Sequence, residues 1–175
     1  MATIEVERSL APLTLDDLNE LYSGSVSCRN EYFINGHGRK WQKYYDINNP
    51  LAVALCQGAA MHYHDNINGI KDFDVWFFYA FNQKHLPYRT YWNWDYINPK
   101  FGKHPLIPGY KGRKVDVLVR SIKHYSEGDP VSTIHQFLRH ENTTSSNELA
   151  KKGVVLLAPE SLLGKTVWYK QCFYK

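Results

Sequence analysis

Three aspartates are the residues of this 175-residue chain whose types and spacing best suit chemistry. Asp72 and Asp74 lie two residues apart in the run DFDV, which continues into an apolar and aromatic stretch. Side chains alternate along a β-strand, so both carboxylates should point to one face. Two like charges held that close raise one pKa unless a cation lies between them. Because Mg²⁺ binds through one or two carboxylates plus substrate phosphates, the pair indicates a magnesium site, with Mn²⁺ as the other candidate ion.

Asp116 is the candidate for a third carboxylate, since it is the one acid in the alternating run KVDVLV. Its strand would lie beside that of Asp72 and Asp74. Gly58 follows another apolar run, and a glycine there lets backbone amides approach a phosphate, which a following helix N-terminus would also favour. A D-x-D pair alone is a weak signal, because such pairs often end a strand in solvent. The ordered set of apolar strand, glycine, short helix, DFDV and later strand acid is what favours a site.

Helices and strands alternate among the elements that must position these residues. Apolar or alternating runs predict strands at residues 51–56, 72–81, 114–121 and 154–157. One helix is predicted at residues 14–22, with Thr14 as cap and Ser23-Gly24 as stop, and a short one at 61–65. A third is predicted at residues 130–140 with Asp129 as cap. The last two run from the Ser145–Glu148 capping box to Gly153 and from Pro159 toward Lys170.

Residues 82–112 are rich in Pro, Gly, Asn, Tyr and Trp, and they predict an extended insertion with little regular structure. The element order predicts an α/β or α+β fold with a mixed β-sheet flanked by helices. The length fits one domain spanning residues 1–175.

These residues resemble the motifs of the nucleotidyltransferase superfamily, which has a polymerase-beta-like fold. In that family a strand ends in hydrophobic-Gly-Gly or Gly-Ser, Asp-hydrophobic-Asp/Glu-hydrophobic follows about ten residues later, and a third acid lies on a later strand. Here Gly58-Ala59 matches the first motif, residues 72–75 match the second, and Asp116 matches the third. The stretches CQGAAMHYHDNINGIKDFDVWF and VVLLAPESLLGK resemble the branch that contains abortive-infection nucleotidyltransferase toxins and bacterial relatives without a described function.

The resemblance implies a magnesium-dependent nucleotidyltransferase that moves a nucleoside monophosphate from an NTP to an unknown acceptor, which would be RNA, protein or a small molecule. It implies metal binding and catalysis by Asp72, Asp74 and Asp116. The amides of Gly58 and Ala59 would hold the triphosphate, and Lys165 would contact a phosphate, although a solvated surface lysine is the simpler reading of Lys165.

Two departures from the family pattern keep a second hypothesis open. Ala59 replaces the usual Gly or Ser, so a hydroxyl contact to the phosphate is missing, and the aromatic insertion carries no recognition motif. The alternative is a catalytically inactive nucleotidyltransferase-fold module that binds a partner, with RNA as one candidate. A third reading is that the motif is coincidental, in which case the three aspartates would not cluster.

Two other groups of residues give weaker evidence for a functional site. His62, His64 and Asp65 resemble zinc ligands only superficially, because histidines two apart do not share a helix face and no further ligand pattern accompanies them. The insertion mixes aromatic with basic residues, which suits base stacking, but packing is favoured because aromatic side chains most often build cores and interfaces. The aromatic residues in question are Tyr88, Tyr91, Trp92, Trp94, Tyr96, Phe101 and Tyr110.

Composition excludes several protein classes. The net charge of +4 is compatible with a phosphate-bearing partner without requiring one. The three cysteines form no CxxC pair, so a zinc knuckle or disulfide framework is not indicated and a reducing compartment is expected. Neither a signal peptide nor a run of about 18 apolar residues is present, so we expect a cytoplasmic protein that can form oligomers. The sequence also lacks a Walker A, a G-x-G-x-x-G and a G-x-S-x-G motif.

Overall fold

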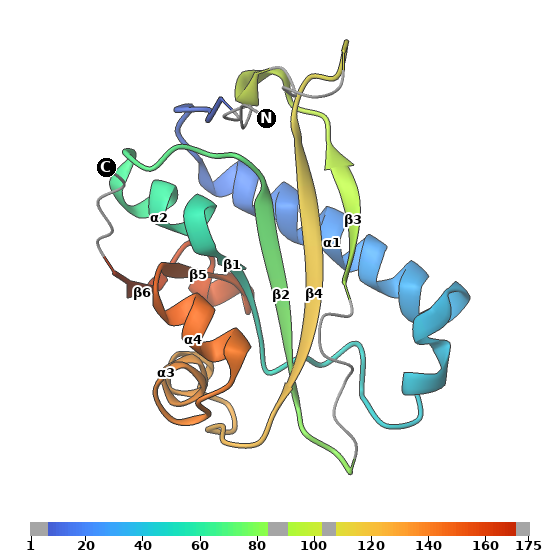
Figure 1. The fold of residues 1–175 in the computed structure, drawn as a ribbon. Coiled ribbons are helices and arrows are strands. Elements are labelled where there is room, and N and C mark those ends of the chain that lie inside the picture. The colour runs from blue at the N-terminus through green and yellow to red at the C-terminus, as the bar shows by residue number, and fades with distance from the viewer. Residues whose placement is uncertain (1–6, 84–90, 103–107, 171–175) are drawn as a thin grey trace, which may run out of the picture.

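The structure is a computed structural model that describes residues 7–83, 91–102 and 108–170 (Figure 1). In these residues six strands form one mixed sheet in the order β3-β4-β2-β1-β5-β6, so the predicted mixed sheet and α+β class are confirmed. β2 and β4 are parallel, and the other neighbouring pairs are antiparallel. The strands are β1 (Ala52–Cys56), β2 (Phe73–Ala80), β3 (Tyr91–Tyr96), β4 (Arg113–Ile122), β5 (Gly153–Ala158) and β6 (Thr166–Tyr169).

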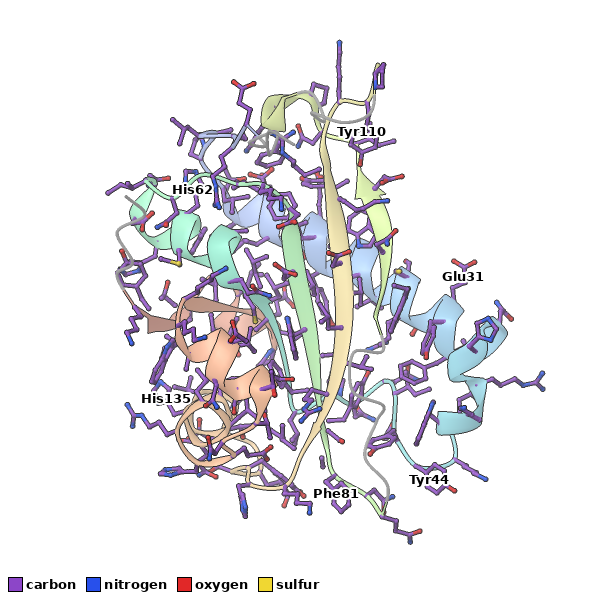
Figure 2. The ribbon with its side chains drawn as sticks, viewed as in Figure 1. Glu31, Tyr44, His62, Phe81, Tyr110 and His135 are labelled. Carbon is purple, nitrogen blue, oxygen red and sulfur yellow. The ribbon has the colours of Figure 1, made fainter. Side chains whose placement is uncertain are left out.

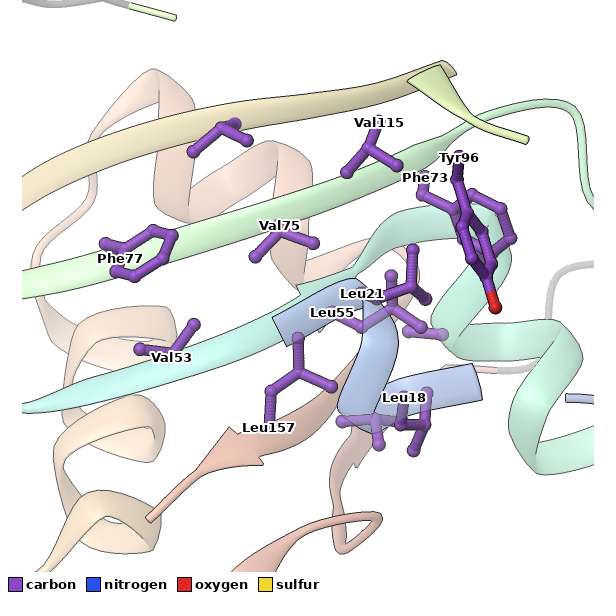
Figure 3. Packing of buried hydrophobic residues seen from close by; sticks show 14 of the residues in the cluster. Leu18, Leu21, Val53, Leu55, Phe73, Val75, Phe77, Tyr96, Val115 and Leu157 are labelled. Atoms are coloured by element: carbon purple, nitrogen blue, oxygen red, sulfur yellow. The ribbon is translucent and has the colours of Figure 1, made fainter. Parts of the chain in front are cut away.

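Helix α1 (Leu15–Asn35) covers one face of the sheet and runs behind β2 and β4 in Figure 1. Leu18 and Leu21 of this helix lie among the inward side chains of β1, β2 and β4, as Figure 3 shows. Apolar side chains at alternate strand positions fill this core, since each strand turns every second residue toward α1. The strand residues of this cluster include Val53, Leu55, Phe73, Val75, Phe77, Val115, Val117 and Val119.

Helices α3 (Pro130–His140) and α4 (Thr144–Ala150) lie on the opposite face. They enclose a second apolar cluster with β1, β5 and β6, to which Trp76 and Phe78 of β2 also belong. The cap of α3 is the predicted Asp129, whose carboxylate accepts hydrogen bonds from the Ser132 backbone amide and hydroxyl. This cover leaves Asp116, Leu118 and Arg120 of β4 only half-buried. At the start of β2 and β4, this face carries the half-buried Asp74 and Asp116.

The sequence located the start of α1 and misplaced its end. Thr14 forms a capping box with Asp17, as a cap at that residue requires. The helix does not stop at Ser23-Gly24 but continues to Asn35. The reason lies in tertiary packing, because the Trp94 ring lies against Gly24 and its indole nitrogen donates to the Ser25 hydroxyl over 3.1 Å.

Three further expectations are wrong in detail. The segment after Pro159 forms only the short 3₁₀ turn η3 (Glu160–Leu162) and then β6, instead of a helix toward Lys170. The insertion is not irregular throughout, since it contributes the edge strand β3 and the turn η2 (Pro99–Phe101). Helix α4 is capped by Thr143, which pairs with Ser146, rather than by Ser145 with Glu148. No helix in the described part of the chain is long and apolar enough to span a membrane.

Candidate carboxylate and nucleotide site

The parallel pairing of β2 with β4 brings two of the three predicted aspartates together. Asp74 and Asp116 are register partners on neighbouring strands, which lie about 4.8 Å apart in any sheet. Both are half-buried and share the face opposite α1. Asp72 precedes β2 by one residue and lies two residues from Asp74. The expected juxtaposition of DFDV with the later strand acid is therefore present.

Burial and the repulsion of neighbouring carboxylates raise the pKa values of Asp74 and Asp116. Burial, followed by the charges of Asp72 and Asp116, raises the pKa of Asp74 to about 7 from an ordinary 3.8. Burial and the charge of Asp72 also raise the pKa of Asp116. The three carboxylates therefore act on one another, and an arrangement of like charges at one place gains stability when a cation binds.

The N-terminus of α2 (Gln57–Asp65) lies beside the same acids. Its cap residue, Cys56, is the register partner of Asp74 in the antiparallel β1–β2 pair, and no side chain caps the helix. The expectation of one or two helical turns at residues 61–65 therefore underestimated this helix, which begins directly after β1. Uncapped amides at a helix N-terminus favour anions such as phosphate.

Gly58 and Ala59, the predicted triphosphate contacts, occupy the first turn of α2. A Cβ atom at Gly58 would meet only Nη1 of Arg8 within 4 Å, at 3.7 Å, so the backbone there is accessible. The Ala59 side chain is buried in the core, which leaves its backbone amide as the group that a ligand would contact. Gln57 has a φ of 63°, which is costly for a residue with a side chain and is typical of functional sites.

Two lysines at the site were missed by the sequence analysis. The charges of Lys152 and Lys71 partly offset the rise in the pKa of Asp74. Nζ of Lys152 lies 3.5 Å from Oε1 of Gln57. Lys152 precedes β5, whose pairing with β1 brings it to this end of the sheet. Lys165 was the lysine named from the sequence, but it is exposed and its charge acts on Asp129 at the start of α3.

The donor set suits a divalent cation, although it is not a ready-made metal cage. In the described residues, no group of three or more His, Cys, Asp or Glu side chains is arranged to hold a metal ion. Mg²⁺ rarely uses such an all-protein cage, because it is usually held by one or two carboxylates, water and substrate phosphates. Asp74 with Asp116 or Asp72 would be the carboxylates of such a site, and the adjoining helix N-terminus and lysines would be the groups that face phosphates.

Two residues of the H-x-H-D run, His62 and Asp65, form hydrogen bonds with backbone groups of the fold. His62 is fully buried, its Nε2 donates to the Ala11 carbonyl over 3.0 Å, and its Nδ1 accepts from the Gly69 amide over 3.0 Å. Asp65 accepts hydrogen bonds from the amides of Ile67 and Asn68. Both ring nitrogens of His62 are thus used within the fold, which argues against a zinc site at the H-x-H-D run.

The aromatic side chains of the insertion that the structure describes make contacts within the fold, and Trp92 and Trp94 pack against α1. The Trp92 ring stacks on Tyr32 with a centroid distance of 4.1 Å, and Tyr96 and Phe101 are buried. Tyr88 and the Tyr91 side chain lie outside the described parts, and the Tyr110 hydroxyl donates to Asp95. Packing accordingly explains these rings better than base stacking does.

Comparisons with protein-family models, curated proteins and solved structures gave no match to this chain.

Proposed function

We propose that this chain is a magnesium-dependent nucleotidyltransferase that moves a nucleoside monophosphate from an NTP to an acceptor hydroxyl. The observation that carries the proposal is the register pairing of Asp74 with Asp116 on the sheet face opposite α1, beside the uncapped N-terminus of α2. Carboxylates for a metal and amides for phosphates are the two kinds of group that phosphoryl transfer requires, because its catalysis consists mainly of positioning and charge stabilisation. We also propose that the protein is cytoplasmic, because Cys28 and Cys56 are free thiols, as expected in a reducing compartment.

Each residue has a defined part in this reaction. Asp72 and Asp74 would hold the metal, which Asp116 would share, and its charge would offset that of the triphosphate. The amides of Gly58 and Ala59 would bind phosphate oxygens, and Lys152 would add positive charge. The acceptor oxygen attacks the α-phosphorus, the bond to the β-phosphate breaks, and pyrophosphate leaves. Asp116 accepts the proton of the acceptor hydroxyl, a role for which a raised pKa suits a carboxylate.

Thermal unfolding with each NTP in Mg²⁺ or Mn²⁺ tests the proposal without knowledge of the acceptor. A ligand at about 100 times its Kd stabilises the native state by about 2.7 kcal/mol, which corresponds to a rise in Tm of roughly 5–10 °C for a chain of this size. We expect such a metal-dependent rise in the wild type and in Asp16→Asn, an exposed control outside the cluster. We expect none in the Asp74→Asn/Asp116→Asn double variant.

The competing hypothesis of an inactive binding module predicts a different result. A module that has lost its metal site would show no rise with any NTP and metal, or an equal rise in the wild type and the double variant. Either result would overturn the proposal. If the expected rise is found, incubation with α-³²P-labelled NTPs and separate RNA, protein and small-molecule fractions identifies the class of acceptor.

A further inference from the structure

A basic and aromatic surface lies between α1 and β1, formed by residues 39–44 and called here the 39–44 segment. It includes the end of the 3₁₀ turn η1 (His37–Trp41). Two pockets adjoin along it. One, of about 280 Å³, is lined by Lys40, Trp41, Lys43 and Tyr44. The other, of about 460 Å³, is lined by Arg39, Lys40, Gln42 and Lys43. The two lysines belong to both, so an aromatic pocket and a cationic pocket share a wall.

Three cations of this segment are free of carboxylate partners among residues 7–83, 91–102 and 108–170. In the described residues, no carboxylate lies within ion-pair distance of Arg39, Lys40 or Lys43. Instead Nζ of Lys40 lies 5.7 Å from the centroid of the Trp41 ring, and Nζ of Lys43 lies 5.0 Å from that of Tyr44. In the part of the chain that the structure describes, three positive charges within five residues therefore have no carboxylate partner and attract an anion, and the Trp41 ring beside them offers a flat apolar surface.

We propose that the 39–44 segment binds single-stranded nucleic acid. An unpaired base would stack on Trp41 in the first pocket, and the adjoining phosphate would lie against Arg39, Lys40 and Lys43 in the second. Base stacking on aromatic rings combined with a cationic track for the backbone is the general mode of single-strand binding. A duplex presents no free base face, so double-stranded nucleic acid is the poorer ligand.

A membrane surface fits this segment less well. Insertion into a bilayer needs aromatic side chains that project from the protein. Trp41 and Tyr44 are half-buried and pack against the core beneath α1. Their centroids are 6.1 Å apart with an interplanar angle of 52°, so they form the walls of a concave surface rather than a projecting apolar tip.

This surface is separate from the carboxylate site. Figure 2 shows Tyr44 toward the lower end of the molecule. Tyr110, which precedes β4, lies toward the upper end, where β2 and β4 begin. The Tyr44 carbonyl accepts a hydrogen bond from Asn82, just beyond β2, whereas Asp74 is at the start of that strand. The six residue-to-residue steps from Asp74 to Ala80 span about 20 Å at ~3.3 Å per residue. The inference therefore stands whether or not the chain transfers nucleotides.

Fluorescence anisotropy with a labelled 12-nucleotide single-stranded RNA of mixed sequence, titrated with the full chain over a range of salt, tests the inference. We expect the charge reversal Lys40→Glu/Lys43→Glu to weaken binding at least tenfold at low salt. It should also flatten the slope of log K against log salt by about 1.4, since each phosphate contact contributes about 0.7 on a single strand. Lys111→Glu/Lys151→Glu changes the charge equally at exposed sites elsewhere and should keep more of the affinity and the wild-type slope.

The rings are tested by Trp41→Ala and Trp41→Phe, with circular dichroism as the check on folding. Stacking predicts a loss of about tenfold or more for alanine and near wild-type binding for phenylalanine. The exposed lysine variants keep the test decisive if Trp41→Ala fails to fold. The inference is overturned if the wild type does not bind the RNA at low salt, if Lys40→Glu/Lys43→Glu binds as the control does, or if phosphatidylserine vesicles bind the wild type while the RNA does not.

Discussion

The two faces of the β2–β4 pair differ in almost every physical respect, although they alternate residue by residue along the same strands. The face toward α1 presents Phe73, Val75 and Val117 to a closed apolar core. The opposite face carries the half-buried Asp74 and Asp116, and the pKa values of both carboxyl groups are raised. At the start of β2 and β4, one face thus supplies burial and the other carries charges that repel one another in the absence of a cation, whereas further along β2 Trp76 and Phe78 belong to the apolar cluster under α3 and α4. Neighbouring residues of β4, such as Asp116 and Val117, therefore belong to the candidate site and to the core, respectively.

The largest effect should come from exchanging the two kinds of residue at neighbouring positions of β4. Val117→Asp places an unpaired charge in the α1 core, so we expect a loss of at least about 3 kcal/mol in the free energy of unfolding. Asp116→Val removes a repelling carboxylate, so the stability should stay within about 1 kcal/mol of wild type or rise, while metal-dependent NTP binding is lost. Urea denaturation measures both. Similar losses in the two variants would contradict the difference between the faces.

The pH dependence of stability should also distinguish the faces. The pKa of Asp74 is about 7 in the folded state and near 3.8 when unfolded, so the folded state binds more protons between these values. Stability without metal is then highest below pH 4 as far as this group is concerned, and falls as the pH rises through 7. The loss should be on the order of 4 kcal/mol, since the change in pKa from 3.8 to about 7 corresponds to about 1.4 kcal/mol per unit.

Urea denaturation in EDTA from pH 4 to pH 8 measures this effect. The wild type and the exposed control Asp16→Asn should lose stability relative to Asp74→Asn as the pH rises, and saturating Mg²⁺ should reduce the difference. Parallel stability curves for the wild type and Asp74→Asn would show that Asp74 does not titrate as described.

A smaller effect is expected where the insertion closes the α1 face. A Cβ atom at Gly24 would lie 2.3 Å from the Trp94 ring, so Gly24→Leu must displace that ring. We expect a destabilisation of about 1–3 kcal/mol by overpacking, offset in part by about 1 kcal/mol of helix propensity. Ser27→Leu places the same side chain on the exposed side of α1 as the control. If Gly24→Leu were as stable as Ser27→Leu, Trp94 would not pack on α1 as described.

The smallest effect concerns the start of α1. The Thr14 hydroxyl accepts a hydrogen bond from the Asp17 amide over 3.2 Å. Thr14→Ala removes this bond and should cost about 1 kcal/mol in the free energy of unfolding. Ser23→Ala, at an exposed position within the helix, should cost less. NTP binding should be unchanged in both, because α1 lies on the face that carries no site, and a large loss of binding in Thr14→Ala would contradict that separation.

Hydrophobic periodicity was sufficient to predict the elements that carry the acids. The apolar run at residues 51–56 and the alternation at 114–121 predicted β1 and β4, including the assignment of Asp116 and Val117 to opposite faces. Asp129-Pro130 likewise fixed the start of α3. These signals are local, because a strand or a capped helix start is specified by its own few residues.

Long-range pairing is what the sequence did not disclose. The helix-breaking Ser23-Gly24 is overridden by Trp94, which lies about 70 residues away in sequence. Lys152 reaches the acids only because β5 pairs with β1. The short strand at Thr166–Tyr169 depends on β5 for its hydrogen bonds and was mistaken for a helix. A single sequence gives residue types and local spacing, whereas neighbours across a sheet follow from the register of strands far apart in the chain.

A crystal structure of the full chain with Mn²⁺ and a non-hydrolysable NTP analogue tests the central claim most directly. We predict an anomalous peak for Mn²⁺ within bonding distance of Asp74 and of at least one of Asp72 and Asp116. The phosphates should lie against the first turn of α2, at Gly58 and Ala59. Metal and nucleotide bound elsewhere, or phosphates held without any of the three carboxylates, would contradict the account.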